Sequence, residues 1–289
     1  MKRKHLILAD LHPWLRAAAT LLVALSSLAG FAQLPALSDA QAQAMVRRVL
    51  KIEDISIHPT THLMRYRLCK RSPRLATTKW IVETQDGDVA HLVAFNDQPL
   101  SPDRQQLEDN RIHALLSDPA LQRHRLQREA QDSERLRKII HALPDAFLYH
   151  YADILNTPQG AVYRLIFQPN PAFNPVDLET QVLKAMAGEL WIDVASQRVT
   201  RLQCTRIRDI EYGWGFFGKL DKGGSLLIEQ QNIGANQWRI TRMVLAMNAR
   251  LLFKPVQLDT TLEMSDYAPV PSGIDYRQGI SILEQLPPK

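Results

Sequence analysis

Apolar and polar residues alternate with a period of two along most of the chain, a pattern typical of β-strands. The runs before residue 101 are residues 52–57, 63–69, 79–84 and 89–95. The runs after residue 146 are residues 147–155, 161–167, 188–193, 198–204, 223–229, 237–247 and 251–264. Asp86-Gly87 predicts a hairpin between two of these runs, because glycine supplies the positive φ that tight hairpin turns need. The pattern therefore predicts about 11 strands.

Two segments follow the helical period instead. Residues 41–50 predict a short amphipathic helix, and residues 101–143 predict a charged helical insert. Ser101 is suited to cap the insert with Pro102 at its first position, and Pro119 predicts a break into two helices. Near its end the insert carries an apolar stripe at helical spacing, made of Leu136, Ile139, Ile140 and Leu143. The tail from Ala268 to Lys289 is expected to wrap the surface.

The order of these elements predicts an α+β fold. The connections between strand-like runs are short, which favours antiparallel pairing, because parallel strands need long crossover segments. A long antiparallel sheet tends to curl, so we expect an incomplete β-barrel of about 11 strands. The apolar stripe of the insert predicts that the insert packs on the concave face of this sheet.

The N-terminus has the pattern of a secretory signal peptide. Basic residues at positions 2–4 precede an apolar run from Ala17 to Ala32. The small residues Gly30 and Ala32 lie at the −3 and −1 positions of a cleavage site before Gln33. We expect cleavage after Ala32, export to the periplasm, and a mature chain, residues 33–289, that forms a single domain. An uncleaved membrane anchor is the alternative, although a spanning helix needs about 20 apolar residues.

The net charge of the mature chain indicates which classes of partner to expect. The formal charge of the whole chain is +5. Without the four basic residues and one acid of the signal, the count becomes 31 against 29, or +2. A nearly neutral mature chain gives no reason to expect nucleic acid as a partner.

Cys69 and Cys204 are the only cysteines. In an oxidising compartment they could pair, or each could be a separate buried thiol, and the spacing favours neither.

Three segments together resemble the LolA-like family, which includes exported bacterial proteins described as outer-membrane lipoprotein-sorting proteins. They are Lys79–Ser101, Leu143–Phe167 and Gly188–Met264. The resemblance implies an incomplete antiparallel barrel around helices, with an apolar concavity that takes up lipoprotein acyl chains in the carriers. A related sensor domain has the same fold and a regulatory role. The chain departs from the carriers in its greater length and in its long charged insert.

The sequence contains no recognisable catalytic, metal-binding or cofactor-binding motif. His58-Pro-Thr-Thr-His62 reads as a turn, because Pro59 disfavours the helix that would bring both imidazoles to one metal ion. Asp86-Gly-Asp88 lacks the ligand pattern of a calcium loop. Gly223-Gly-Ser225 precedes a strand, whereas phosphate cradles and nucleophile elbows precede a helix. We therefore expect a non-enzymatic protein without metal or cofactor, although a site assembled from scattered residues remains an alternative.

Apolar strand residues are the remaining candidates for a site. Ten of them recur at period two within their runs and are predicted to face inward: Trp80, Val82, Val93, Phe95, Tyr163, Leu165, Phe167, Met243, Leu245 and Met247. An ordinary packed core explains the same pattern. The functional hypothesis is that part of this face stays unfilled for an apolar ligand, such as a lipid or a lipoprotein acyl chain.

The alternative function is a non-enzymatic sensor or interaction module that binds an envelope protein. Its candidate surface is the basic side of the insert, formed by Arg111, Arg123, Arg125, Arg128, Arg135, Arg137 and Lys138. Acidic residues are interspersed there, so an ordinary solvated helix face accounts for the same residues.

Overall fold

The computed structural model describes residues 36–56, 62–212, 218–251 and 254–287. The predicted signal peptide, the segment from His58 to Thr61 and residues 213–217 lie outside the described residues. Residues Leu37–Lys289 form one compact unit, and the following description concerns this unit by itself. None of the helices in the described residues is both long and apolar enough to cross a bilayer.

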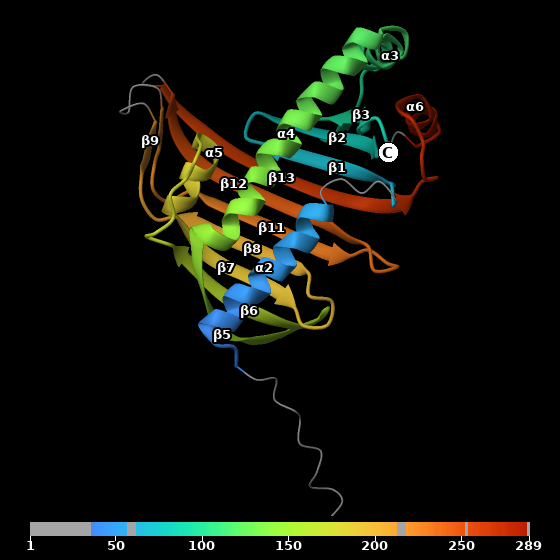
Figure 1. The fold of residues 1–289 in the computed structure, drawn as a ribbon. Helices are drawn as coiled ribbons and strands as arrows, with labels where there is room; N and C mark the ends of the chain where they lie inside the picture. The colour runs from blue at the N-terminus through green and yellow to red at the C-terminus, as the bar shows by residue number, and fades with distance from the viewer. Residues whose placement is uncertain (1–35, 57–61, 213–217, 252–253, 288–289) are drawn as a thin grey trace, which may run out of the picture. The chain divides into compact units, whose positions relative to one another are not determined.

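The unit is built on one antiparallel sheet in which 13 strands are described (Figure 1). Its order is β4-β3-β2-β1-β13-β12-β11-β8-β7-β6-β5, and β9 and β10 attach beside β12. The strands are β1 Met64–Ser72, β2 Leu75–Val82, β3 Val89–Phe95, β4 Gln98–Pro99, β5 Phe147–Thr157, β6 Gly160–Pro169, β7 Met186–Asp193, β8 Val199–Arg206, β9 Ile210–Tyr212, β10 Gly218–Leu220, β11 Ser225–Asn232, β12 Trp238–Leu251 and β13 Lys254–Pro269. The sheet is curled and not closed, which confirms the predicted fold class.

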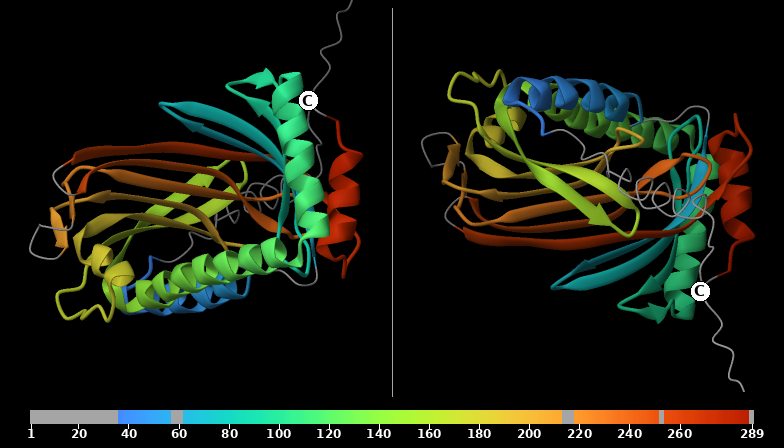
Figure 2. Two further views of the ribbon diagram at one scale, coloured as in Figure 1. Left: turned by 90° about the horizontal axis from the view of Figure 1, so that it is seen from above. Right: turned by 90° about the horizontal axis from the view of Figure 1, so that it is seen from below.

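The helices are α2 Asp39–Ser56, α3 Pro102–Ser117, α4 Pro119–Ala146, α5 Leu178–Gln181 and α6 Tyr276–Glu284, with a 3-10 turn at Val182–Ala185. The predicted insert is thus two helices that break before Pro119. The carboxylate of Asp118 caps the second helix by accepting a hydrogen bond from the backbone N–H of Ala120 at 2.8 Å. Figure 2 shows α2 and α4 together on one side of the sheet, whereas α3 and α6 lie at its β2–β3 end.

Helix α2 is longer than the sequence predicts and includes residues 52–56. The prediction of a strand at residues 52–57 is therefore wrong for the residues that the structure describes. The buried stripe of α2 runs from Ala42 through Val46 and Val49 and ends in Glu53, which is only 9% exposed. A carboxylate can occupy the next apolar position of the helical period, because it pairs with Arg198, which directly precedes β8. The helical pattern is therefore hidden after Leu50.

Helix α6 was missed altogether in the tail. Asp275 and Gln278 form a capping box, in which each side chain accepts a hydrogen bond from the backbone N–H of the other residue, at 2.8 and 3.0 Å. Ile280 and Leu283, spaced by three residues, are both 1% exposed. These two signals are local and would have predicted the helix.

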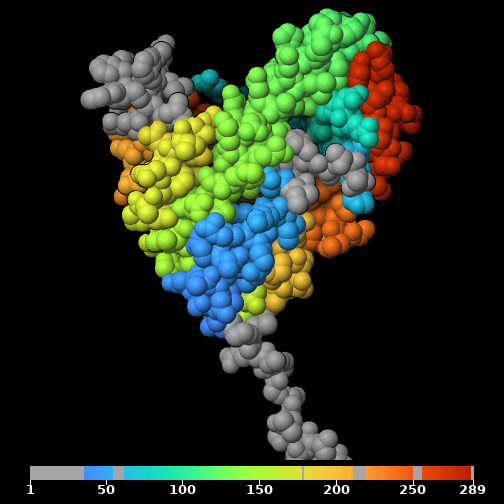
Figure 3. All heavy atoms as spheres, in the orientation of Figure 1, coloured from blue at the N-terminus to red at the C-terminus, as the bar shows by residue number. Residues whose placement is uncertain are grey.

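Two apolar cores lie on opposite faces of the sheet. The inner core joins α2 and the end of α4 to strands β5 to β8, and its fully buried members include Val46, Leu165 and Ile192. In the space-filling view α2 (blue) and α4 (green) cover this part of the sheet side by side (Figure 3). The outer core joins α3 and α6 to β2 and β3, around Trp80 and Val82. We call the face that α2 and α4 cover the inner face.

The structure excludes a disulfide between Cys69 and Cys204. Cys69 lies on β1 and Cys204 on β8, and three strands separate them in the sheet. Four strand spacings amount to about 19 Å, whereas the Cα atoms of a disulfide lie within about 7 Å of each other. Cys204 is in the inner core, 5% exposed. The second alternative, two separate thiols, therefore holds.

Thiol labelling should distinguish the two cysteines. Burial raises the pKa of the Cys204 thiol to about 12, whereas Cys69 is half-buried near the Thr78 hydroxyl. Because the thiolate is the reactive form, we expect a thiol reagent at pH 8 to modify Cys69 in the folded protein and Cys204 only after unfolding. Mass spectrometry of labelled peptides measures this. Equal labelling of both cysteines in the folded protein would contradict the assigned burial.

Candidate functional site

One row of side chains crosses the inner face from strand to strand. Directly paired residues of antiparallel strands project from the same face of a sheet, so the strand register gives the row: Leu165, Leu190, Leu202, Ile228, Met243, Leu262 and Lys70. Burial declines along it. Leu165 and Leu190 are 0% and 4% exposed, the members from Leu202 to Leu262 are half-buried, and Lys70 is exposed. The helices therefore cover only half of the row.

A parallel row shows the same decline. It runs from Cys204, in the inner core, through Leu226 to Leu245 and Thr260. Beyond the inner core, eight apolar side chains of this face are half-buried or exposed and belong to neither core. We call them the open inner face: Leu68, Ile228, Met243, Leu245, Met247, Leu258, Leu262 and Met264. An apolar surface of this kind on one side of a sheet is a candidate binding site.

The outer face of the same strands is ionic. One outer row contains Arg201, Glu229 and Arg242, and both arginines pair with the glutamate, at 3.4 and 3.8 Å. Further along the sheet Arg164 pairs with Asp153 at 2.6 Å and lowers the pKa of that carboxyl group. The outer face therefore has the composition of a surface in contact with water. Nothing that packs on the outer face explains why the open inner face is apolar.

Helix α4 places two leucines opposite the open inner face. Leu126 follows Gln122 by four residues and Leu136 precedes Ile140 by four, so all four share one side of the helix. Gln122 contacts the β2–β3 turn and Ile140 packs on the inner core, which identifies this side as the one toward the sheet. Nevertheless Leu126 and Leu136 are 37% and 45% exposed. The middle of α4 thus faces the sheet without packing against it.

The N-terminal part of α4 is held by the β2–β3 turn. Arg125 donates hydrogen bonds to the carbonyls of Asp86, at 2.8 Å, and Asp88, and it pairs with Glu129 at 2.9 Å. Gly87 has a φ of 86°, and a Cβ there would lie 1.9 Å from the Glu129 carboxylate. The predicted turn at Asp86-Gly87 is confirmed. Its glycine is required by the positive φ, and a Cβ there would also displace the flexible end of the Glu129 side chain.

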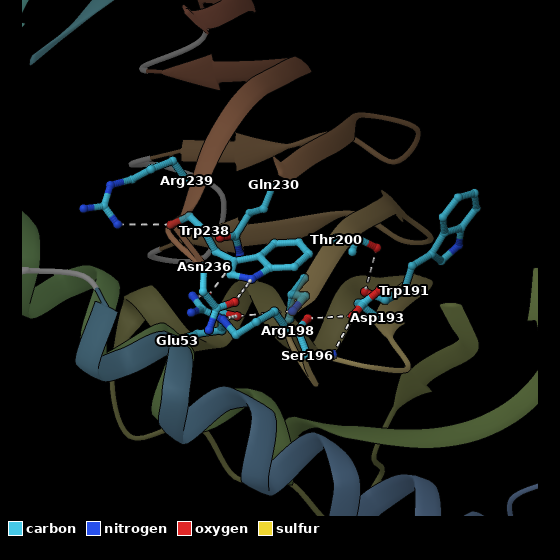
Figure 4. A network of polar contacts seen from close by, with 11 residues as sticks. Glu53, Trp191, Asp193, Ser196, Arg198, Thr200, Gln230, Asn236, Trp238 and Arg239 are labelled. Atoms are coloured by element: carbon cyan, nitrogen blue, oxygen red, sulfur yellow. Dashed lines mark hydrogen bonds and ion pairs between the residues drawn. The ribbon is translucent and has the colours of Figure 1, made fainter. Parts of the chain in front are cut away.

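A polar network fixes the end of α2 beside the open inner face (Figure 4). The Glu53 carboxylate accepts hydrogen bonds from Arg198 at 2.9 Å, from the backbone N–H of Val199 at 3.2 Å and from Gln230 at 3.1 Å. Gln230 is two residues from Ile228, so it lies at the border of the apolar surface. Since the carboxylate oxygens are satisfied by the protein itself, this network positions α2 and does not offer a site for a ligand.

The ten predicted site residues lie in four places. Trp80, Val82 and Val93 belong to the outer core. Phe95 is paired with Thr77, which is paired with Lys70, so it lies on the inner face, with the Arg104 guanidinium 3.8 Å from its ring centre. The inner core contains Tyr163, Leu165 and Phe167. The open inner face contains Met243, Leu245 and Met247.

The structure thus brings the last three together with residues that the sequence analysis did not select. In β13 the missed residues are Leu258, Leu262 and Met264, and their period-two spacing was the available signal. Their side of the sheet was not recognisable, because it depends on pairing between β13, β12 and β1.

Two depressions in the surface do not have the chemistry of an acyl site. One of about 360 Å³ on the outer side of α4 is lined almost entirely by polar residues: Ala130, Gln131, Glu134, Arg135, Lys138 and Glu179. The other, between α3, α6 and β3, has a volume of about 30 Å³, close to that of a single water molecule. Among the residues with described positions, no group of three or more His, Cys, Asp or Glu side chains could hold a metal ion.

No protein-family model and no curated protein matches the sequence. Among solved structures, the chain is similar to a domain described as an outer membrane lipoprotein-sorting protein from Vibrio parahaemolyticus, with 11% identity and a TM-score of 0.33, covering 83% of this chain and 100% of that one. It is also similar to a LolA superfamily protein from Nitrosomonas europaea, with 10% identity and a TM-score of 0.29, covering 78% and 92% of the two chains. A DUF1329 family protein from Desulfovibrio piger gives 12% identity and a TM-score of 0.30, covering 84% and 98%. The family that the sequence resembles is therefore among its structural neighbours, and at these identities the likeness says nothing about side chains.

Proposed function

We propose that this chain is an exported, non-enzymatic carrier or binding protein that holds an acyl chain against the open inner face. The observation that carries the proposal is the loss of cover along one continuous apolar row, from the buried Leu190 to the half-buried Met243 and Leu262. The exposed leucines of α4, Leu126 and Leu136, provide an apolar surface opposite. A ligand between the two would cover both.

The energies are adequate for such a ligand without a specific polar contact. Each buried methylene contributes about 0.8 kcal/mol, so half-burial of ten methylenes contributes about 4 kcal/mol. Met243, Met247 and Met264 have flexible, polarisable side chains that adapt to a chain without fixed shape. The predicted secretory signal supports a periplasmic location, where lipids and lipoproteins move between membranes.

Protein purified from the periplasm under native conditions tests the proposal. We expect native mass spectrometry to show a bound lipid or lipid-derived species, and the delipidated protein to take up a fluorescent fatty acid at a one-to-one ratio. Ligand-free protein that takes up no fatty acid would contradict the proposal, since the open inner face would then have no apolar occupant.

The alternative function, a sensor or interaction module that docks through the basic side of the insert, has weaker support. Most of its candidate residues are engaged within the chain: Arg111 with Glu108, Arg125 with the β2–β3 turn, Arg135 with Asp132, Arg137 with Asp54 and Lys138 with Asp177. These contacts are made within the chain, so the basic side chains involved are already paired. Arg123 and Arg128 remain as exposed candidates for a partner.

A further inference from the structure

We infer that the ligand of the open inner face is an anionic amphiphile, an acyl chain ending in a carboxylate or phosphate group that Lys70 and Lys79 bind. The inference rests on the proposed function, because it assigns the polar end of the same ligand. It adds a chemical class and an orientation: the acyl chain lies across β11, β12 and β13, and the headgroup lies at β1 and β2.

Strand register places both lysines at one end of the apolar surface. Lys70 is paired with Leu262, the last apolar residue of the inner row before β1, and Lys79 is paired with Leu68, a member of the open inner face. Lys70 is paired with Thr77 on β2, so Lys79 is its diagonal neighbour. Diagonal neighbours of this kind lie about 7 Å apart. Two ammonium groups on flexible side chains can therefore reach one headgroup.

The charge of these lysines is not balanced by the described part of the chain. Arg67 and Arg71 alternate with Lys70 on β1 but project to the outer face, where they pair with Asp266 at 2.5 Å and with Asp97 at 3.0 Å. Within the residues that the structure describes, no carboxylate lies at ion-pair distance from either lysine. Lys79 is also half-buried. A half-buried ammonium beside apolar side chains is stabilised by an anion that arrives with the ligand.

The length of the surface suits an amphiphile with a long chain. From Leu202 on β8 to Lys70 on β1 the row crosses four strand spacings, or about 19 Å. One end of the row is closed by the inner core, and the other reaches the exposed Lys70 on β1. An acyl chain with an anionic headgroup has the same polarity along its length.

The experiment compares ligands with the same tail and different heads. Displacement of a fluorescent fatty acid is measured for palmitate against its uncharged methyl ester, and for lysophosphatidylglycerol against zwitterionic lysophosphatidylcholine of the same chain. We expect the wild-type protein to bind at least one anionic member about tenfold more tightly than its counterpart. Whichever anionic member shows the larger preference identifies a carboxylate or a phosphate as the natural headgroup.

Variants locate the preference. In Lys70→Gln/Lys79→Gln we expect the affinity for the anionic ligand to fall about tenfold while the affinity for the uncharged ester is unchanged. Arg71→Gln, on the outer face of the same strand, should leave both affinities unchanged. Circular dichroism and the thermal midpoint verify that the variants are folded.

The possible failures are separable. If acid and ester bind equally tightly, or if the double lysine variant keeps the full preference for the acid, the headgroup assignment is wrong and the acyl-binding proposal stands. If neither the acid nor the ester binds to the folded wild-type protein, the acyl-binding proposal itself is wrong.

Discussion

The double variant Ile228→Gln/Met243→Gln is expected to bind a fatty acid about 30-fold more weakly than the wild-type protein, a loss of about 2 kcal/mol. The two side chains are directly paired at the centre of the open inner face. Each substitution removes apolar area that an acyl chain would cover and adds an amide that the chain would deprive of water. Glutamine is uncharged, so the variant does not alter attraction of an anionic headgroup. Fluorescence titration with a labelled fatty acid measures the loss.

The matched control is Leu227→Gln/Val244→Gln. These residues are the next positions on the same two strands, are directly paired in the same way, and are also half-buried. They project from the outer face, beside the ionic row of Arg201, Glu229 and Arg242. We expect this control to bind the fatty acid as the wild-type protein does. Equal losses in both double variants would mean that the effect is a general weakening of the sheet, and the inner face would lose its assignment.

Local patterns account for the parts of the fold that the sequence predicted. Period-two alternation predicted the longer strands of the sheet, and Pro119 predicted the break between α3 and α4. Residues close in sequence determine these features. Strands β9 and β10 have three residues each, too few to establish a period. The pairing of β1 with β13 joins segments about 200 residues apart in the chain, and no local pattern contains it.

The candidate site was harder to predict, because alternation shows which residues share a face and not which side of the sheet that face lies on. In β2 the alternation separates Trp80 and Val82 from Lys79 and Ile81. The more apolar set was expected to face inward, but it lies in the outer core. The reason is α6, whose Ile280 and Leu283 cover that side from the C-terminal tail. As a consequence Lys79 projects from the inner face, where we infer that it binds an anionic headgroup.

Glu53→Ala is expected to lower the free energy of unfolding by about 3–5 kcal/mol. The side chains of Glu53 and Arg198 are only 11% and 13% exposed, so the substitution removes the carboxylate from a guanidinium that water solvates poorly. It also removes the acceptor of the Val199 N–H and the Gln230 amide. Equilibrium unfolding in urea measures the change. Asp145→Ala is the comparison, because the pair of Arg47 and Asp145 also anchors α2, in this case to α4.

That comparison pair is 51% and 62% exposed, and exposed ion pairs contribute about 0–1 kcal/mol. The double variant Glu53→Leu/Arg198→Met removes both charges and keeps similar volume, but it still leaves the Val199 N–H without its acceptor. We therefore expect it to be more stable than Glu53→Ala and to lie within about 1–3 kcal/mol of the wild-type value. Recovery of stability in the double variant would show that the loss in Glu53→Ala comes mainly from removing the carboxylate beside the buried Arg198 guanidinium. If Glu53→Ala instead costs no more than Asp145→Ala, the network at the end of α2 is solvated, and it does not fix α2 beside the open inner face.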